Sequence, residues 1–300
     1  MVGKAHRRLK IAILGSGGRL GAALARAYAD EHEVIGFDHA KLDIGSAGQI
    51  DQALAPCSFD VLINSAALTN VDYCETHEEE AVRINADAVR QIAEICARKN
   101  ARCIHISTDY VFDGEKTSPY CEKDDAKPIS VYGESKRRGE IELLGVSEKN
   151  LAVRVSWVFG PDRPSFIDAI LKRALESDHA EAIGDKFSAP TYTLDVAELL
   201  RPFLRDISEG GLLHVCNTGE CTWRDYGRFA IDCARAAGLP VRAQKVGSLK
   251  MAEMKAFVAK RPVYTVLATD KLARLTGKTP RSWQNAVEDY VANKVAPALR

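Results

Sequence analysis

Apolar and polar positions follow two different patterns along the first half of the chain. Short, uninterrupted apolar runs predict strands at residues 10–14, 34–37, 60–64, 103–106 and 151–156. Such runs are typical of parallel strands that are buried on both faces of a sheet. Segments with helical periodicity separate them, and residues 78–99 carry an apolar stripe that indicates a helix packed on a core. The alternation predicts an α/β fold with a doubly wound, parallel Rossmann sheet.

The pattern changes near residue 160. Helices are expected at residues 165–175, 193–204 and 223–237 and from Trp283 onward, with one further strand at 212–216. The loss of strict alternation indicates a second, smaller unit assembled from C-terminal segments. We therefore expect two domains, with substrate bound in the crevice between them. They are an NAD(P)-binding Rossmann domain at 9–160, joined by part of 191–219, and a mainly substrate-binding domain at 161–300.

A glycine-rich turn follows the first predicted strand. Gly15, Gly18 and Gly21 have the spacing G-x-x-G-x-x-G, and helical residues come next. Glycines in such a turn let backbone amides and the helix N-terminus approach a pyrophosphate, and the last glycine lets helix and strand pack closely. Because strand and helix flank the glycines in the required order, the turn predicts a dinucleotide-binding site.

Asp38 directly follows the second predicted strand, where a carboxylate commonly binds the adenosine ribose of a dinucleotide, although an ordinary turn residue would also fit there. Asp38 would repel a 2′-phosphate and so favours NADH. Arg19, His39 and Lys41 could each attract that phosphate and so favour NADPH. The sequence is therefore compatible with either cofactor, and the three basic side chains slightly favour NADPH.

Small residues follow the third predicted strand. Ser65, Ala66 and Ala67 would let a cofactor lie across the carboxyl end of the sheet, although a close helix contact would explain Ser65 equally well. Asn85 is a polar residue within the apolar stripe of the next helix. We expect its amide to satisfy a nearby loop rather than to touch substrate.

A tyrosine and a lysine stand one helical turn apart at Tyr132 and Lys136. This spacing places both side chains on one helix face, about 6 Å apart along the axis, although such pairs also occur on solvated helices. An ammonium group beside a phenol favours the phenolate, so we expect Lys136 to lower the pKa of Tyr132 and make it a usable proton donor. Thr108 ends the fourth predicted strand, and its hydroxyl could stabilise a substrate oxygen that gains negative charge.

Composition narrows the class of protein. The 300 residues include 41 basic and 41 acidic side chains, so the formal net charge is zero. This balance argues against binding to nucleic acid or a membrane surface, and no apolar run approaches the roughly 18 residues of a membrane span. The eight cysteines lack C-x-x-C or zinc-ligand spacing. We therefore expect no metal site, and reduced, mostly buried cysteines in a cytoplasmic protein.

Taken together, the motifs resemble the extended short-chain dehydrogenase/reductases and, more narrowly, the dTDP-4-dehydrorhamnose reductase family. The resemblance covers residues 9–295. It is carried by N-S-A-A-L-T-N-V-D-Y-C-E at 64–75, S-T-D-Y-V-F-D-G at 107–114, Y-G-E-S-K-x-x-G-E at 132–140, R-V-S-W-V-F-G at 154–160, and A-P-T-Y-T-x-D at 189–195. The departures from the family pattern leave the Thr-Tyr-Lys set untouched. They are Ser65 for alanine, Leu68 at a variable position and Phe159 for the commoner tyrosine.

The resemblance implies roles for the site residues, which fall into a cofactor set and a sugar set. The cofactor phosphates would contact Gly18, Arg19 and Leu20, the adenosine ribose would contact Asp38, and the adenine would contact Asp43 and Ile44. The rest of the cofactor would contact Gly15, Gly21, Ala66, Ala67, Leu68, Thr69, Ser107, Tyr132 and Lys136. The sugar pocket would be lined by Thr108, Asp109, Tyr110 and Trp157, with Val71 against the sugar or base.

The implied reaction is hydride reduction of the C4 carbonyl of dTDP-4-dehydro-L-rhamnose. Thr108 and Tyr132 would stabilise the oxygen, and Tyr132 would deliver the proton. The expected partner is thus a nucleotide sugar, and a homodimer is allowed.

Other interpretations stay open. An epimerase or reductase of another nucleotide 4-keto-6-deoxy sugar would share the Thr-Tyr-Lys set. A non-catalytic NADP-binding regulatory subunit, resembling that of methionine adenosyltransferase, can keep the tyrosine and lysine as well. A dehydratase is disfavoured, because related 4,6-dehydratases place a glutamate where this chain has Tyr110. The intact sugar-side set of Asp109, Tyr110 and Trp157 favours an enzyme.

Overall fold

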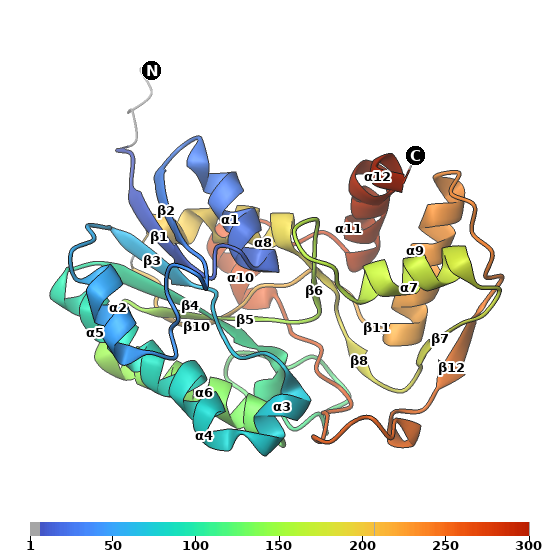
Figure 1. The fold of residues 1–300 in the computed structure, drawn as a ribbon, viewed down its shortest axis with the longest axis horizontal. Coiled ribbons are helices and arrows are strands. Elements are labelled where there is room, and N and C mark those ends of the chain that lie inside the picture. The colour runs from blue at the N-terminus through green and yellow to red at the C-terminus, as the bar shows by residue number, and fades with distance from the viewer. Residues whose placement is uncertain (1–6, 207, 300) are drawn as a thin grey trace.

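A parallel six-stranded sheet forms the centre of the protein, in the order β10-β5-β4-β3-β1-β2 (Figure 1). The computed structural model describes residues 7–206 and 208–299. The strands are β1 (Lys10–Leu14), β2 (Glu33–Phe37), β3 (Val61–Asn64), β4 (Arg102–Thr108), β5 (Leu151–Val155) and β10 (Gly211–His214). All the strands predicted for the first half of the chain enter this sheet, and the doubly wound α/β fold is confirmed.

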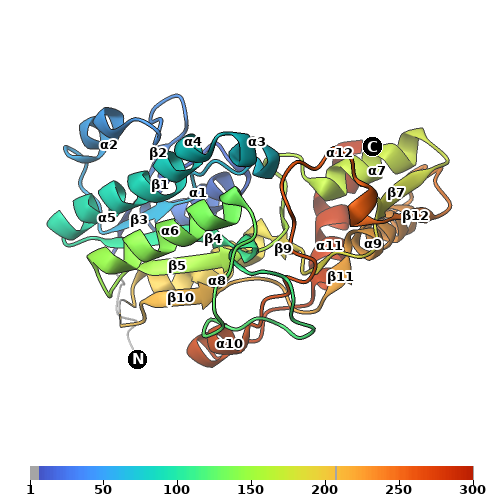
Figure 2. The same cartoon turned by 90° about the horizontal axis from the view of Figure 1, so that it is seen from below.

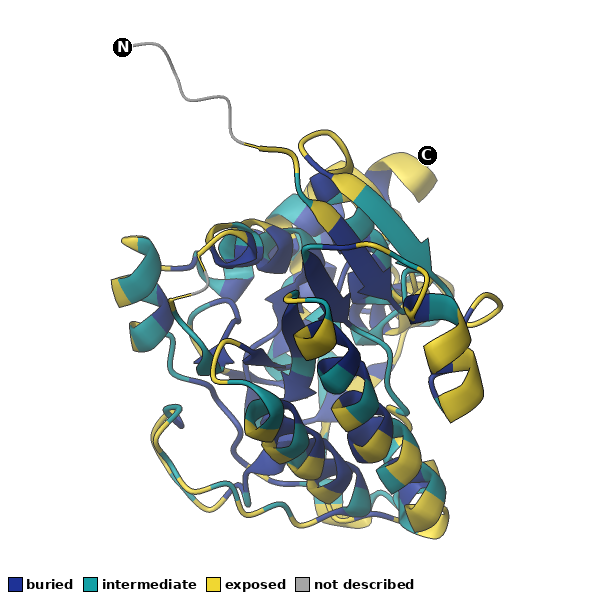
Figure 3. Ribbon diagram, turned by 90° about the vertical axis from the view of Figure 1, so that its left-hand side faces the viewer, coloured by how far each residue is buried: buried dark blue, intermediate teal, exposed yellow. Residues whose placement is uncertain are grey.

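Helices cover both faces of the sheet (Figures 1 and 2). Ile11 and Ile13 of β1 pack in one hydrophobic cluster with α1 (Arg19–Ala29), α8 (Thr193–Leu200) and α10 (Asp270–Thr276). Ala12 and Leu14, which point the other way, pack with α2 (Ala47–Leu54), α5 (Ala88–Arg98) and α6 (Val131–Val146). The strands β1, β3, β4 and β5 are therefore buried on both faces, as their apolar runs predict, whereas β2 at the sheet edge is only partly buried (Figure 3).

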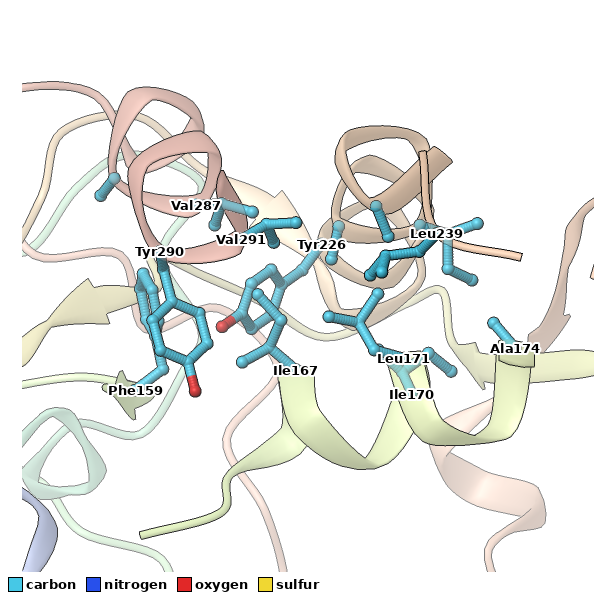
Figure 4. Packing of buried hydrophobic residues seen from close by; sticks show 14 of the residues in the cluster. Phe159, Ile167, Ile170, Leu171, Ala174, Tyr226, Leu239, Val287, Tyr290 and Val291 are labelled. Atoms are coloured by element: carbon cyan, nitrogen blue, oxygen red, sulfur yellow. The ribbon is translucent and has the colours of Figure 1, made fainter. Parts of the chain in front are cut away.

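A third hydrophobic cluster lies in the C-terminal half. It joins α7 (Phe166–Glu176), α9 (Trp223–Ala236) and α11 (Trp283–Tyr290) around buried residues such as Leu171 and Tyr226 (Figure 4). Short two-stranded pairs border it. They are β6 (Val158–Phe159) with β9 (Thr191–Tyr192), β7 (Ala180–Ile183) with β12 (Val246–Leu249), and β8 (Phe187–Ser188) with β11 (Cys221–Thr222).

Three C-terminal segments cross back to the large sheet. β10 pairs with β5, α8 packs on α1 through a hydrogen bond of 2.8 Å from the Tyr28 hydroxyl to the Ala197 carbonyl, and α10 contacts β10. The chain thus leaves the Rossmann sheet after β5 and returns to it more than once. The assignment of binding roles to the two domains stays a prediction.

The helix predicted at 78–99 is interrupted. α3 (Val71–Thr76) and α4 (Glu78–Val82) precede a π-helical turn, η1 (Arg83–Asp87), and α5 completes the segment. Such turns insert one extra residue and frequently mark functional sites. The helix predicted at 193–204 likewise ends in a 3₁₀ turn, η3 (Arg201–Leu204), which contains Pro202.

The remaining short elements follow strands or extend helices. They are η2 (Asp109–Val111), η4 (Met251–Glu253), η5 (Val291–Val295) and α12 (Ala296–Leu299). Periodicity alone did not predict α2, α3 or α10, because one or two turns carry too little pattern.

All eight cysteines lie in the described part of the chain and are unpaired, and five of them are buried. Among residues 7–206 and 208–299, no three His, Cys, Asp or Glu side chains are grouped as metal ligands. None of the helices in these ranges combines the length and hydropathy of a membrane-spanning segment.

Candidate active site

A cleft of about 1170 Å³ lies along the carboxyl ends of the sheet strands. Residues that end or directly follow strands form its floor: Gly15 after β1, Asp38 after β2, Ser65 after β3, Thr108 at the end of β4 and Val155 at the end of β5. Parallel strands bring their carboxyl ends to one edge of the sheet, so segments far apart in the sequence meet there.

Nearly every residue predicted for the site lines this cleft, and Gly21 is the exception. The predicted residues in the lining are Gly15, Gly18, Arg19, Leu20, Asp38, Asp43, Ile44, Ala66, Ala67, Leu68, Thr69, Val71, Ser107, Thr108, Asp109, Tyr110, Tyr132, Lys136 and Trp157. Their roles toward a cofactor or a sugar stay predictions.

The glycine turn is built for close approach of the backbone. Gly15 has a φ of 74°, and a Cβ on Gly21 would lie 2.2 Å from the Gly15 carbonyl oxygen. Gly21 therefore serves the packing of α1 on the turn rather than the lining of the cleft. Gly18 is the N-cap of α1, so the first amides of the helix face the cleft end where a pyrophosphate would be favoured.

The Arg19 side chain is engaged by a loop that the sequence analysis missed. Its guanidinium donates to the carbonyl of Arg163 at 3.0 Å and also to that of Pro164. In return, Arg163 Nε donates to the Gly17 carbonyl at 3.0 Å, and Arg163 itself lines the cleft. No local pattern in the sequence signals this contact, because about 145 residues separate the partners along the chain.

The end of the cleft beside β2 holds the groups expected to bind adenosine. Asp38 Oδ1 accepts from the Lys41 backbone amide at 3.0 Å, and His39 borders the same space. Lys41 is absent from the lining, and its Nζ lies 3.4 Å from the Gly36 carbonyl oxygen. Of the three basic side chains weighed for a 2′-phosphate, Arg19 and His39 thus border the cleft and Lys41 does not.

Asn85 of the π-helical turn holds the segment after β3. Its Oδ1 accepts from the Leu68 amide at 2.9 Å, and its Nδ2 donates to the Leu68 carbonyl at 3.0 Å and to the Ser135 hydroxyl at 3.0 Å. The expectation that Asn85 satisfies a nearby loop is confirmed. The loop concerned is the one that carries Ala67 and Leu68 into the cleft.

Tyr132 lies in the first turn of α6, which begins where the Ser130 hydroxyl accepts from the Gly133 amide at 3.3 Å. Its ring meets Tyr110 edge-on, with centroids 5.6 Å apart. Burial raises the pKa of Tyr132 above its usual value, and the neighbouring Thr108 hydroxyl opposes this only in part. The expected lowering of this pKa is therefore wrong for the protein chain by itself, because desolvation of the phenolate dominates.

Lys136 is turned toward β4 rather than toward the Tyr132 oxygen. Its Nζ lies 2.9 Å from His105 Nε2 and donates to the Ile106 carbonyl at 2.7 Å. Burial lowers the pKa of Lys136 to about 7, and Glu140 acts in the opposite direction. Near neutral pH, this amine can therefore gain or lose a proton.

Thr108 connects the candidate proton donor to a buried carboxylate. Its hydroxyl donates to Asp109 Oδ1 at 3.1 Å and accepts from the Tyr110 amide at 3.2 Å. Asp109 Oδ2 accepts from Thr265 at 2.5 Å and from Ser188 at 3.3 Å. Burial raises the pKa of Asp109 although Lys186 and these hydroxyls act against it. Asp109 thus holds Thr108 in place as well as bordering the cleft.

Trp157 also lines the cleft. Its φ of 39° lies in the left-handed region, which is strained for a bulky residue and typical of functional positions. The indole packs against Trp223 and Tyr226, with centroids 5.6 and 6.5 Å away, so it links the cleft to the C-terminal cluster. Its Nε1 has no hydrogen-bond partner among the described residues.

A buried ion pair beneath the cleft was not anticipated. Glu140 and Arg154 are both fully buried, and the Ser107 hydroxyl donates to Glu140 Oε1 at 2.6 Å. Ser107 thus lines the cleft while its hydroxyl points into this pair. The available signal was the last glutamate of the Y-G-E-S-K-x-x-G-E motif.

Residues 9–295 match the family model described as the RmlD substrate binding domain. The chain belongs to this family. A curated relative, the dTDP-4-dehydrorhamnose reductase of Aggregatibacter actinomycetemcomitans, is 33% identical over 94% of this chain and 98% of its own. A probable dTDP-4,6-dihydroxy-2-methyloxan-3-one 4-ketoreductase of Streptomyces antibioticus is 32% identical over 92% of each chain.

A solved reductase structure has the same fold. The dTDP-4-dehydrorhamnose reductase of Bacillus anthracis, crystallised in complex with NADP, superposes with a TM-score of 0.87 at 28% identity, covering 94% of this chain and 98% of its own. This chain is therefore similar to that reductase over nearly its whole length.

Proposed function

We propose that this protein reduces the C4 carbonyl of dTDP-4-dehydro-L-rhamnose to give dTDP-L-rhamnose, with NADPH or NADH as the reductant. The observation that carries the proposal is the single cleft that joins the glycine turn at Gly15 to the hydroxyl pair of Thr108 and Tyr132. The names of its RmlD-family relatives support the same substrate class, a nucleotide sugar. The NADP bound to the Bacillus anthracis protein supports the expectation of NADPH.

The residues of the chain fit such a cofactor. The glycine turn and the N-terminus of α1 would hold the pyrophosphate, Asp38 would bind the adenosine ribose, and Tyr132 with Lys136 would reach the nicotinamide ribose. The reduced nicotinamide, when bound, supplies hydride to the carbonyl carbon.

Side chains of the protein supply the proton and stabilise the negative charge that develops on the carbonyl oxygen. As the carbonyl oxygen gains negative charge, Tyr132 transfers its phenolic proton to it. Thr108 stabilises the same oxygen by a hydrogen bond once its hydroxyl hydrogen turns from Asp109 Oδ1 to the substrate. Burial raises the pKa of Tyr132, so the group holds its proton until the substrate oxygen takes it. A protonated Lys136 would then stabilise the phenolate that remains.

The test is a spectrophotometric assay of NADPH and NADH oxidation, side by side, with dTDP-4-dehydro-L-rhamnose generated in place. We expect turnover that falls at least about 10²-fold in Tyr132→Phe, the scale of a lost positioned acid. Near-normal turnover in that variant would show that Tyr132 is not the acid. If the protein instead reduces only another nucleotide 4-keto-6-deoxy sugar, that sugar is the substrate. The name of the Streptomyces antibioticus relative, a probable ketoreductase of a different dTDP sugar, is the reason to include this test.

If the protein reduces no keto sugar but binds NADPH with micromolar affinity or better, the result would indicate a regulatory subunit. Isothermal titration with NADPH, followed by isolation of the proteins that co-purify with this chain, separates that outcome from an inactive preparation. The homodimer and the cytoplasmic location stay predictions.

A further inference from the structure

Three buried polar side chains form a line from the sheet to the base of the cleft. Asn64 ends β3 and is paired in register with His105 of β4, so their side chains lie beside each other on one face of the sheet. Lys136 of α6 lies over that face. Asn64 and His105 are 0% exposed and Lys136 is 1% exposed, so the hydrogens between these three side chains are shared within the protein, and the remaining hydrogen of Lys136 can face the cleft that it lines.

The orientation of the Asn64 amide is determined by the backbone. The Ala66 amide donates to Asn64 Oδ1 at 3.1 Å, and a backbone N–H cannot accept. The oxygen of the side chain must therefore face Ala66. Its other end, Nδ2, lies 3.2 Å from His105 Nδ1 and can only donate.

The position of the imidazole proton follows from this orientation. Because Asn64 Nδ2 donates, His105 Nδ1 must present its lone pair. A neutral imidazole then carries its hydrogen on Nε2. Burial lowers the pKa of His105 well below its usual value, so the doubly protonated ring is disfavoured.

The Nε2 hydrogen points at Lys136 Nζ, 2.9 Å away. An ammonium group has three donors and no acceptor, so it cannot receive this hydrogen. An uncharged amine can, because its lone pair accepts from Nε2–H while one of its own hydrogens goes to the Ile106 carbonyl at 2.7 Å.

We propose that Asn64 and His105 are positioning residues that select the protonation state of Lys136. The Asn64 amide holds His105 as the Nε2–H tautomer, and this tautomer hydrogen-bonds to uncharged Lys136. Charging Lys136 requires the imidazole proton to move to Nδ1. There it would face the Asn64 amide hydrogens, unless that amide turns and releases the Ala66 N–H.

The other ionisable groups near Lys136 do not account for this arrangement. Tyr132 and Glu140 share its helix, and Glu140 favours the ammonium form. Glu140 is in turn held by Arg154 of β5 and by Arg137. Asp109 of η2 and Cys74 of α3 raise the pKa of Tyr132, whereas the charged group that acts on the pKa of Lys136 is Glu140. The line through His105 to Asn64 is thus the contact that opposes the charge, together with burial itself.

The inference deepens the proposed function and, for its catalytic meaning, rests on it. Reduction requires protonated Lys136 beside the Tyr132 phenolate. Asn64 favours the uncharged amine, so Lys136 loses its proton at a lower pH than it would without Asn64. Ala66, the residue that orients the Asn64 amide, lines the cleft where the cofactor is expected. The same amide thus connects the cofactor-binding segment to the lysine.

The first test reads the tautomer directly and needs neither substrate nor cofactor. Long-range ¹H–¹⁵N correlation NMR of the imidazoles distinguishes Nε2–H from Nδ1–H, and the spectrum of His105→Gln assigns the His105 signals among the seven histidines. We expect Nε2–H in the native protein. A native His105 that carries its hydrogen on Nδ1 would overturn the proposal, whatever the variants do.

The second test replaces the hydrogen-bond donor that faces His105 Nδ1 with an acceptor. Asn64→Asp has nearly the same shape and two acceptors, so one oxygen still accepts from Ala66 and the other accepts from His105 Nδ1–H. A carboxylate in this place holds the imidazole with its hydrogen on Nδ1, which leaves Nε2 free to accept from an ammonium group. Asn70→Asp is the matched control. It makes the same change at an exposed N-cap, where aspartate can replace the acceptor that Asn70 offers to Tyr73.

In Asn64→Asp we expect the His105 hydrogen to move to Nδ1 and the midpoint of Lys136 ionisation to rise by at least one pH unit. That midpoint is followed by ¹³C NMR of the lysine ε carbons and assigned with Lys136→Met. In Asn70→Asp neither should change. A folded Asn64→Asp protein that keeps the native tautomer, or shows no rise in the Lys136 midpoint, contradicts the proposal.

The reductase assay then separates the two claims. If keto-sugar reduction is found, the alkaline limb of kcat/KM should move to higher pH in Asn64→Asp by the same amount as the lysine midpoint. An unmoved limb would overturn the catalytic meaning of the pair. If no sugar is reduced but the tautomer switches, the proposed function fails and the assignment of Asn64 and His105 stands.

Discussion

Glu140 and Arg154 form a bidentate ion pair beneath the candidate active site. Arg154 Nε and Nη2 each donate to one carboxylate oxygen of Glu140 at 2.7 Å. The pair ties α6, which carries Tyr132 and Lys136, to β5. The guanidinium also lies over the Phe112 ring, with its carbon 4.9 Å from the centroid.

Glu140→Gln should destabilise the fold strongly. The change leaves the buried Arg154 cation without its counter-charge, a situation that typically costs about 3–5 kcal/mol. Chemical denaturation monitored by circular dichroism measures the loss. Glu134→Gln, on the exposed face of the same helix, is the control and should stay within about 0.5 kcal/mol of the native protein. Equal stabilities of the two variants would mean that the pair contributes no net stabilisation.

The contribution of Glu140 should disappear in acid. Burial alone would raise its pKa, but Arg154, Ser107 and Arg137 together hold the pKa below its usual value. A carboxyl group with a depressed folded-state pKa contributes stability that is present above its unfolded pKa, about 4.3, and is lost as pH falls through the folded value. The difference in unfolding free energy between native protein and Glu140→Gln should therefore be constant near pH 7 and shrink below about pH 4. A difference that grows on acidification would contradict this sign.

Asn85→Ala should weaken cofactor binding more than it weakens the fold. The variant removes the Asn85 hydrogen bonds to the backbone N–H and carbonyl of Leu68, at a cost of about 1–3 kcal/mol, and loosens the segment expected under the cofactor. Titration with NADPH should show an affinity at least about fivefold lower, equivalent to about 1 kcal/mol. Asp87→Ala, at an exposed position of the same π-helical turn, serves as the control. Unchanged NADPH affinity in Asn85→Ala would show that the clamp serves stability alone.

Asp38→Asn should shift cofactor preference towards NADPH. The amide keeps an acceptor for the Lys41 backbone N–H but removes the charge that repels a 2′-phosphate. We expect the ratio of kcat/KM for NADPH over NADH to rise about tenfold, equivalent to about 1.4 kcal/mol. Asp30→Asn, at the exposed end of α1, should leave the ratio unchanged. A ratio that stays constant in Asp38→Asn would place the adenosine ribose away from this carboxylate.

Much of the site was accessible from local sequence because it depends on local geometry. The strand, the glycine spacing and the following helix form one contiguous segment, so Gly15 and Gly18 could be placed without the rest of the chain. Tyr132 and Lys136 share a face because they lie one helical turn apart. Asn85 could be assigned to a loop contact because a polar side chain in an apolar stripe needs a partner.

Tertiary structure decided which partner each polar group finds and how much water it loses. Periodicity places Tyr132 and Lys136 on one face of α6. Burial, however, raises the pKa of the tyrosine, and the lysine amine contacts His105 of β4. The contacts of Arg19 with the loop at Arg163, and of Glu140 with Arg154, join segments that no short pattern connects. Charge states follow from desolvation and from partners distant in the chain, whereas helices, strands and glycine turns follow from neighbours along it.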